Sequence, residues 1–195
     1  KKSDVRVICT TDDPVDPLEY HILIAKDESF DVKVLPSFRP DKGLEINRAT
    51  FLPWIEKLAE VSGIAINSYS DFLAALEKRV EFFHEVGCRV SDHALDYVPY
   101  AEATEEEVSA IFAKALRGEK VSLEEEMKHK TYTLLFLGRL YAEHDWAMQY
   151  HMNASRNNNL RMFRQLGPDT GFDSMSDTAI ALPLVGLLSA LDEEA

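Results

Sequence analysis

The chain has 195 residues, with 21 Lys and Arg against 34 Asp and Glu, so its formal net charge is -13. Apolar residues make up 46% and charged residues 28%, a globular composition that excludes a disordered or collagen-like chain. The acidic balance argues against a nucleic-acid partner, and no apolar run approaches the roughly 20 residues that span a membrane.

Four short runs are predicted to be β-strands, because each is rich in β-branched or aromatic residues. They cover residues 5–10, 30–35, 88–91 and 146–152. Helical patterns separate them, which is typical of parallel strands joined by crossovers. The predicted fold class is therefore α/β, either an open sheet or a barrel.

The first crossover is predicted to be a single helix over residues 17–26. Asp16 is placed to cap its N-terminus, and Pro17 suits the first helical position because its φ is already helical. The next two crossovers are far longer than the dozen or so residues that a parallel connection needs. We therefore expect helical insertions at about 42–87 and 101–145.

The first insertion is predicted to contain two helices, over 51–61 and 71–86. Gly63 and Gly87 lie just beyond their ends, where glycine commonly terminates a helix. Apolar residues of the second helix recur at helical spacing, and we interpret that stripe as core packing. The insertion thus adds buried surface rather than a cofactor site.

Capping boxes mark two helix starts in the second insertion. Thr104-Glu105-Glu106-Glu107 and Ser122-Leu123-Glu124-Glu125 each place a capping hydroxyl three residues before a carboxylate that can accept the backbone amide of the capping residue. They predict helices over 108–116 and from 122 to about 144. A last helical pattern covers 178–191.

The two cysteines, Cys9 and Cys88, lie in separate strand-like runs and fit neither a zinc pattern nor a disulfide framework. We interpret both as buried thiols of a cytoplasmic protein. Residue 1 is Lys rather than Met and no signal-like segment follows, so we expect a piece of a longer chain.

Polar residues follow each predicted strand, where ligands bind in parallel α/β folds. The four polar segments cover residues 10–14, 36–41, 91–93 and 151–159. If these ends converge, they bring together two Arg, several Asp and two His. Taken singly, each residue also fits a structural interpretation, as a turn former, a surface charge or a local ion pair.

The residue types at these ends predict a sugar acid as ligand. Arg39 and Arg156 offer forked donors for a carboxylate or phosphate. Asp92 and His151 suit proton transfer or hydroxyl orientation, and nearby Asn and Ser suit a sugar. A Gly-rich phosphate loop, a G-x-S-x-G elbow and an H-E-x-x-H motif are all missing from the sequence.

The same segments resemble the uronate isomerase (glucuronate isomerase) family, and the resemblance covers essentially the whole chain. The segments that carry it are Thr10-Thr11-Asp12-Asp13-Pro14, Leu18-Glu19-Tyr20-His21, Phe38-Arg39-Pro40-Asp41, Val90-Ser91-Asp92-His93, Arg156-Asn157-Asn158-Asn159 and the run 161–174. That last run is long and unusual in composition, so chance similarity does not explain it.

The resemblance implies a distorted (β/α)8 barrel of the amidohydrolase superfamily, a TIM-like fold. It also implies the reversible isomerisation of D-glucuronate to D-fructuronate, and of D-galacturonate to D-tagaturonate, in glucuronate catabolism. In this aldose–ketose isomerisation a proton leaves C2 and returns at C1. Family residues matching Arg39 and Arg156 contact the substrate, and those matching Asp92 and His151 orient hydroxyls or help to move protons.

The sequence also departs from the family. Members carry a His-x-His metal pair on the first barrel strand and an Asp on the last, and neither is present here. A full barrel needs eight strands and about 250 residues. We therefore expect residues 1–195 to be the central part of a barrel, about four β/α units with long helical crossovers.

Three consequences follow from a partial barrel. The divalent metal, zinc or similar, is expected in the complete enzyme with its ligands outside this chain, so the isolated chain is expected to be inactive. Two open sheet edges predict that missing barrel segments or a second copy cover the chain.

Two alternative functions remain open. One is a metal-dependent hydrolase that uses Asp92, His93 and His151 as ligands, and the other is a noncatalytic sugar-acid binding module.

Overall fold

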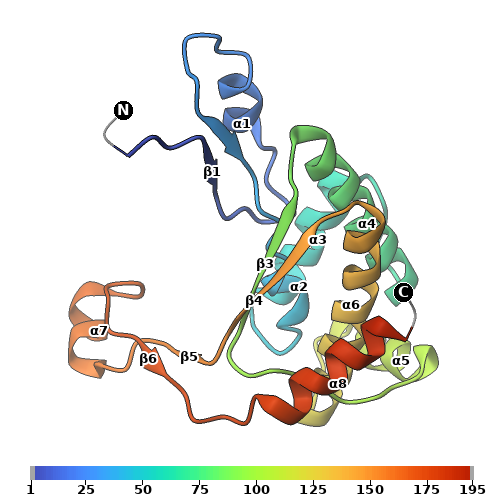
Figure 1. Cartoon of the computed structure of the whole chain (residues 1–195). Coiled ribbons are helices and arrows are strands. Elements are labelled where there is room, and N and C mark those ends of the chain that lie inside the picture. The colour runs from blue at the N-terminus through green and yellow to red at the C-terminus, as the bar shows by residue number, and fades with distance from the viewer. Residues whose placement is uncertain (1–2, 194–195) are drawn as a thin grey trace.

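The computed structural model describes residues 3–193, and helices pack on one side of its central strands (Figure 1). The strands are β1 (Val7–Cys9), β2 (Lys33–Leu35), β3 (Val90–Leu95), β4 (Ala147–Met152), β5 (Ala154–Ser155) and β6 (Ser174–Met175). The helices are α1 (Glu19–Ile24), α2 (Asp41–Leu44), α3 (Phe51–Ser62), α4 (Tyr69–Val86), α5 (Glu105–Leu116), α6 (Leu123–Glu143), α7 (Leu160–Leu166) and α8 (Ala181–Asp192).

The four predicted strands are present and pair in parallel. β1 pairs with β2, and β3 pairs with β4. Phe38, just beyond β2, forms parallel bridges to both Asp12 and Ser91, which link the two pairs. The strands thus lie side by side in chain order, and the α/β prediction is confirmed.

The ends of the third strand differ from the prediction. The sequence placed its end at Ser91, whereas β3 continues to Leu95. Asp92 and His93 therefore lie inside the strand, where successive side chains point to opposite faces of the sheet. The strand is longer because its backbone pairs with β4 along its whole length, from Val90 to Leu95.

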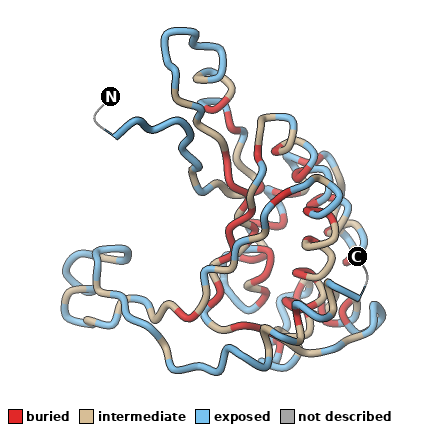
Figure 2. The backbone as a smooth tube through the Cα atoms, viewed as in Figure 1, coloured by how far each residue is buried: buried red, intermediate tan, exposed pale blue. Residues whose placement is uncertain are grey.

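The core lies between the strands and helices α3 to α6. Phe38 is fully buried there, and its ring packs edge-on against that of Phe83 at a centroid distance of 5.1 Å. Figure 2 shows that buried residues concentrate where β3, β4 and the helices meet, while α1 and α7 are largely exposed. The core thus covers one side of the sheet with packed side chains.

Local signals predicted the helix ends well. The hydroxyls of Thr104 and Ser122 cap α5 and α6, and both complete the expected capping boxes. Gly63 and Gly87 end α3 and α4 with φ of 68° and 110°, the left-handed conformation that glycine adopts without strain.

The prediction for the start of α1 was wrong. The residue preceding the helix is Leu18, in the left-handed region, and no side chain caps it. Asp16 is used elsewhere, because its carboxylate accepts the amide of Asp13 at 2.9 Å and its carbonyl accepts Arg79 at 2.9 Å. The loop before α1 is therefore held by its own contacts and by α4.

The prediction that both cysteines are buried was half right. Cys88 is buried, but Cys9 is exposed together with Val7 and Ile8 of β1. β1 is exposed because it pairs only with β2 and stands away from the helices that cover β3 and β4 (Figure 1). Among residues 3–193, the helices do not reach the length and apolar character needed to span a membrane.

Candidate functional site

The two faces of the β3–β4 pair have opposite character. On one face Leu95 packs with Tyr150, Met152 and residues of α2 and α6. Asp92 and His151 alternate with these apolar residues and therefore point to the other face. That face looks away from the helices in Figure 1. A polar surface is thus presented on a rigid sheet.

Arg39 and Asp92 form the centre of this surface. An Arg39 Nη2 donates to Asp92 Oδ2, and the side chains are only 27% and 12% exposed. Gln149 completes the group, because its Nε2 donates to Asp92 Oδ1 at 3.0 Å. Asp92 therefore receives charge and hydrogen bonds from both sides of β3, from the segment that follows β2 and from β4.

His151 lies on the same face, two residues beyond Gln149. It is exposed and stands opposite Ala94 in the parallel register. Its imidazole is thus available to a ligand lying on the sheet beside the Arg39–Asp92 pair.

Arg156 lies farther along the chain, directly after β5. Its Nη1 pairs with Asp173 Oδ2 at 2.7 Å. It lines a hollow of about 700 Å³ whose walls also include Asp41 and Ala94. The structure therefore brings Arg39 into contact with Asp92, places His151 on the same face, and puts Arg156 in an adjoining hollow.

Asp41 was noted from the sequence only as part of the polar segment 36–41, without a role, and Gln149 was not singled out. Asp41 Oδ1 accepts the amide of Ala94 at 3.1 Å, and its Oδ2 lies 3.6 Å from Arg39 Nε. Burial raises the pKa of Asp41 to about 7, and the positive charge of Arg39 opposes this rise. Side chains two residues apart in a strand point to the same face, so Gln149, two residues before His151, could have been predicted to share its face.

His93 faces the opposite way from Asp92. Its ring is fully buried, 5.8 Å from that of Tyr141 and 5.9 Å from that of Tyr150. Burial, assisted by the charge of Arg39, lowers the pKa of His93 to about 3, so the imidazole is neutral. Asp92, His93 and His151 therefore cannot share one metal ion.

The described residues 3–193 contain no cluster of three or more His, Cys, Asp or Glu side chains arranged to hold a metal ion. A structural zinc or catalytic metal site needs at least three protein ligands. The residues in this part of the chain thus do not fit a metal site of their own.

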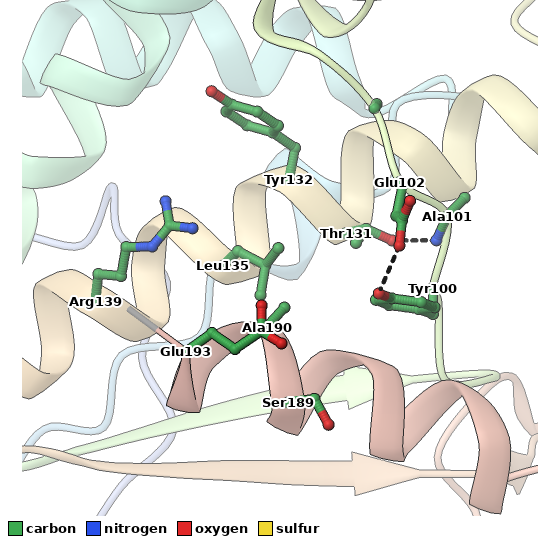
Figure 3. Close-up of a pocket in the computed structure, with 11 residues that line it drawn as sticks. Tyr100, Ala101, Glu102, Thr131, Tyr132, Leu135, Arg139, Ser189, Ala190 and Glu193 are labelled. Carbon is green, nitrogen blue, oxygen red and sulfur yellow. Dashed lines mark hydrogen bonds between the residues drawn. The ribbon is translucent and has the colours of Figure 1, made fainter. Parts of the chain in front are cut away.

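A second cavity, of about 430 Å³, lies between α6, α8 and the segment before α5 (Figure 3). Tyr100 donates to Glu102 at 3.2 Å on one wall, and Glu193, directly after α8, stands on another. Arg39, Asp92, His151 and Arg156 do not line it. It is therefore separate from the polar face of the sheet.

Comparison with known proteins places this arrangement in a family. A sequence model described as glucuronate isomerase matches residues 1–195. The chain belongs to the glucuronate isomerase family. The resemblance expected from the sequence is thus confirmed, and the match covers every segment that carried it.

Relatives in the glucuronate isomerase family are longer than this chain. The uronate isomerase of Clostridium acetobutylicum is 62% identical over 194 residues, which cover 100% of this chain and 42% of the relative. That of Bacillus subtilis is 59% identical over 191 residues, covering 98% and 40%. The chain therefore spans about two fifths of the length of these relatives.

Solved structures agree with the fold. The uronate isomerase of Thermotoga maritima superposes with a TM-score of 0.90 at 34% identity, covering 98% of this chain and 43% of that one. The glucuronate isomerase of Caulobacter crescentus gives a TM-score of 0.86 over 96% and 39% of the two chains, and at 24% identity supports the fold alone. The α/β arrangement described above is thus that of glucuronate isomerases.

Proposed function

We propose that the complete protein interconverts D-glucuronate with D-fructuronate, and D-galacturonate with D-tagaturonate, and that this chain supplies part of the substrate site. The observation that carries the proposal is the polar face of β3 and β4, where the Arg39–Asp92 pair lies beside His151. Family membership supports the reaction type, and the charged and polar side chains of this face would suit a sugar acid.

The isomerisation transfers two protons, one from C2 to C1 and one from the hydroxyl on C2 to the oxygen on C1. The C2–H bond of the open-chain aldehyde breaks, an enediol or enediolate forms, and a proton adds to C1 while C2 becomes the carbonyl. Such a step needs a base, a donor to the carbonyl oxygen and an anchor for the distant carboxylate. The atoms balance without an outside oxidant or reductant.

The residues of this chain suit the anchoring and orienting parts of that task. Arg39 and Arg156 would contact the carboxylate or hydroxyls, since a guanidinium donates in a forked geometry. Asp92, already held by Arg39 and Gln149, would orient a hydroxyl, and exposed His151 would orient a second one or help to move a proton. Binding depends on the local positive charge, because the chain as a whole is acidic.

We also propose that a divalent metal, zinc or similar, is held by residues outside this chain. The described residues provide no cluster of three ligands, so every step assigned here is made by side chains alone. When bound, the metal would polarise an oxygen of the sugar. Metal analysis of the complete protein tests this point, and stoichiometric metal bound by the isolated chain would contradict it.

We further propose that residues 1–195 are the central part of a (β/α)8 barrel. Four parallel strands in chain order support this, as do the exposed apolar residues Val7 and Ile8 of β1 and Leu182 of α8, which is 84% exposed. Missing barrel segments, or a second copy in their absence, would cover these surfaces. Sedimentation of the isolated chain tests the idea, and a compact, stable monomer would contradict it.

The function itself is tested by incubating the complete protein with D-glucuronate and following D-fructuronate by NMR. In D₂O the product should carry deuterium at C1 wherever the enediol exchanges its proton with solvent. The isolated chain should give no product. Tight uronate binding without turnover by the complete protein would instead support a noncatalytic binding module. A cytoplasmic location stays a prediction, which fractionation of cells would test.

A further inference from the structure

We propose that Asp41 is a positioning residue of the uronate site: it ties the start of α2 to β3 and fixes the orientation of the Arg39 guanidinium. This inference rests on the proposed function. Asp41 belongs to α2 rather than to the polar face of β3 and β4, and the sequence analysis assigned it no contact with the substrate.

The two oxygens of Asp41 have separate tasks. Oδ1 accepts the amide of Ala94 at 3.1 Å, a bond that joins the start of α2 to the backbone of β3. Oδ2 faces Arg39 Nε at 3.6 Å. Among the described residues Arg39 Nε has no hydrogen-bond partner, so Asp41 acts on it through its charge, while Arg39 Nη2 pairs with Asp92. The guanidinium thus has a carboxylate on each of two sides.

A purely structural role explains Asp41 poorly. The carboxylate sits in the first turn of α2, but this helix has only four residues, and a solvated Asp would serve its dipole equally well. Asp41 is instead only 19% exposed, and burial raises its pKa to about 7. Keeping a charge there is therefore costly for folding.

This cost separates the two roles experimentally. In Asp41→Asn, the amide oxygen can still accept from Ala94, while the burial cost of the charge disappears. The variant should therefore melt no lower than the wild type. The amide nitrogen, however, carries no negative charge, so the Arg39 guanidinium loses the attraction of one of the two carboxylates beside it. A positioning residue thus predicts lost turnover without lost stability.

The loss should appear in kcat rather than in KM. A misoriented guanidinium weakens interactions that form only in the transition state, which lowers kcat. Removal of a negative charge near the site favours an anionic sugar, so KM should stay unchanged or fall. A merely structural defect would instead lower the fraction of folded enzyme.

The test uses the complete enzyme as wild type, Asp41→Asn and Asp71→Asn. Asp71 is a matched control, because it also lies in the first turn of a helix, α4, and accepts a backbone amide, that of Asn67 at 3.0 Å. We expect Asp41→Asn to lower kcat for D-glucuronate at least about tenfold with a melting midpoint within about 2 °C of wild type. Asp71→Asn should leave kcat unchanged.

Two outcomes would overturn the inference: activity of Asp41→Asn within about twofold of wild type, or a loss matched by a lowered melting midpoint. A wild-type enzyme without activity on uronates would refute the proposed function instead. The crystal structure of Asp41→Asn then still decides the role of Asp41. An Arg39 guanidinium that shifts or loses its order supports positioning, and one that stays in place contradicts it.

Discussion

The buried imidazole of His93 makes acid sensitivity a testable property of the fold. Among the described residues neither ring nitrogen has a hydrogen-bond partner, and burial lowers the pKa of His93 to about 3. In the unfolded chain the pKa returns to about 6.5. Below that pH the unfolded state binds a proton that the folded state does not, so stability is lost as pH falls.

The magnitude follows from the two pKa values. Between pH 7 and pH 5, protonation of the unfolded state should cost the wild type about 2 kcal/mol of unfolding free energy through His93 alone. The substitution His93→Phe fills the site with a ring that does not titrate, and it removes this cost. The stability of the variant minus that of the wild type should therefore grow by about 2 kcal/mol over this range.

Urea unfolding of the chain at pH 7, 6 and 5 measures this difference, with the fluorescence of buried Trp54 and Trp146 as the signal. Other titrating groups cancel because both proteins contain them. Tyr141→Phe is the matched control: it removes a buried polar group beside His93, but burial raises the pKa of Tyr141 far above this range. A His93→Phe difference that stays constant with pH would refute the reasoning.

Two further substitutions test packing and capping by the same unfolding assay. Gly43→Ala should destabilise the chain by about 1–3 kcal/mol, because the new Cβ would lie 2.9 Å from the Trp54 ring; an unchanged urea midpoint would show that Trp54 can move aside. Thr104→Ala should cost about 1 kcal/mol by removing the bond that caps α5. A neutral effect would mean that water replaces this cap.

Features set by neighbouring residues could be predicted from the sequence. The capping boxes at Thr104 and Ser122 and the terminal glycines Gly63 and Gly87 need only a few residues to act, so their helix ends were predicted correctly. The short α2 and α7 and the β5–β6 pair were missed. They are too short for a periodic pattern, and their position depends on contacts with distant segments.

The site was predicted in part for a related reason. Arg39 and Asp92 were singled out because parallel strands gather their polar residues, and the structure brings the two into contact. The face of each side chain depends on the exact end of β3, which the sequence placed four residues too early. His93 was therefore grouped with Asp92, although it points into the core. Asp41 received no role because the backbone amide that it accepts, that of Ala94, lies on β3, far from it along the chain.

The proposed function requires that the polar face of β3 and β4 binds the uronate. A crystal structure of the complete protein with D-glucuronate tests it most directly. We expect the sugar on this face, with its carboxylate or hydroxyls hydrogen-bonded to Arg39 and with His151 and Arg156 turned toward it. A uronate bound elsewhere, touching none of these side chains, would contradict it.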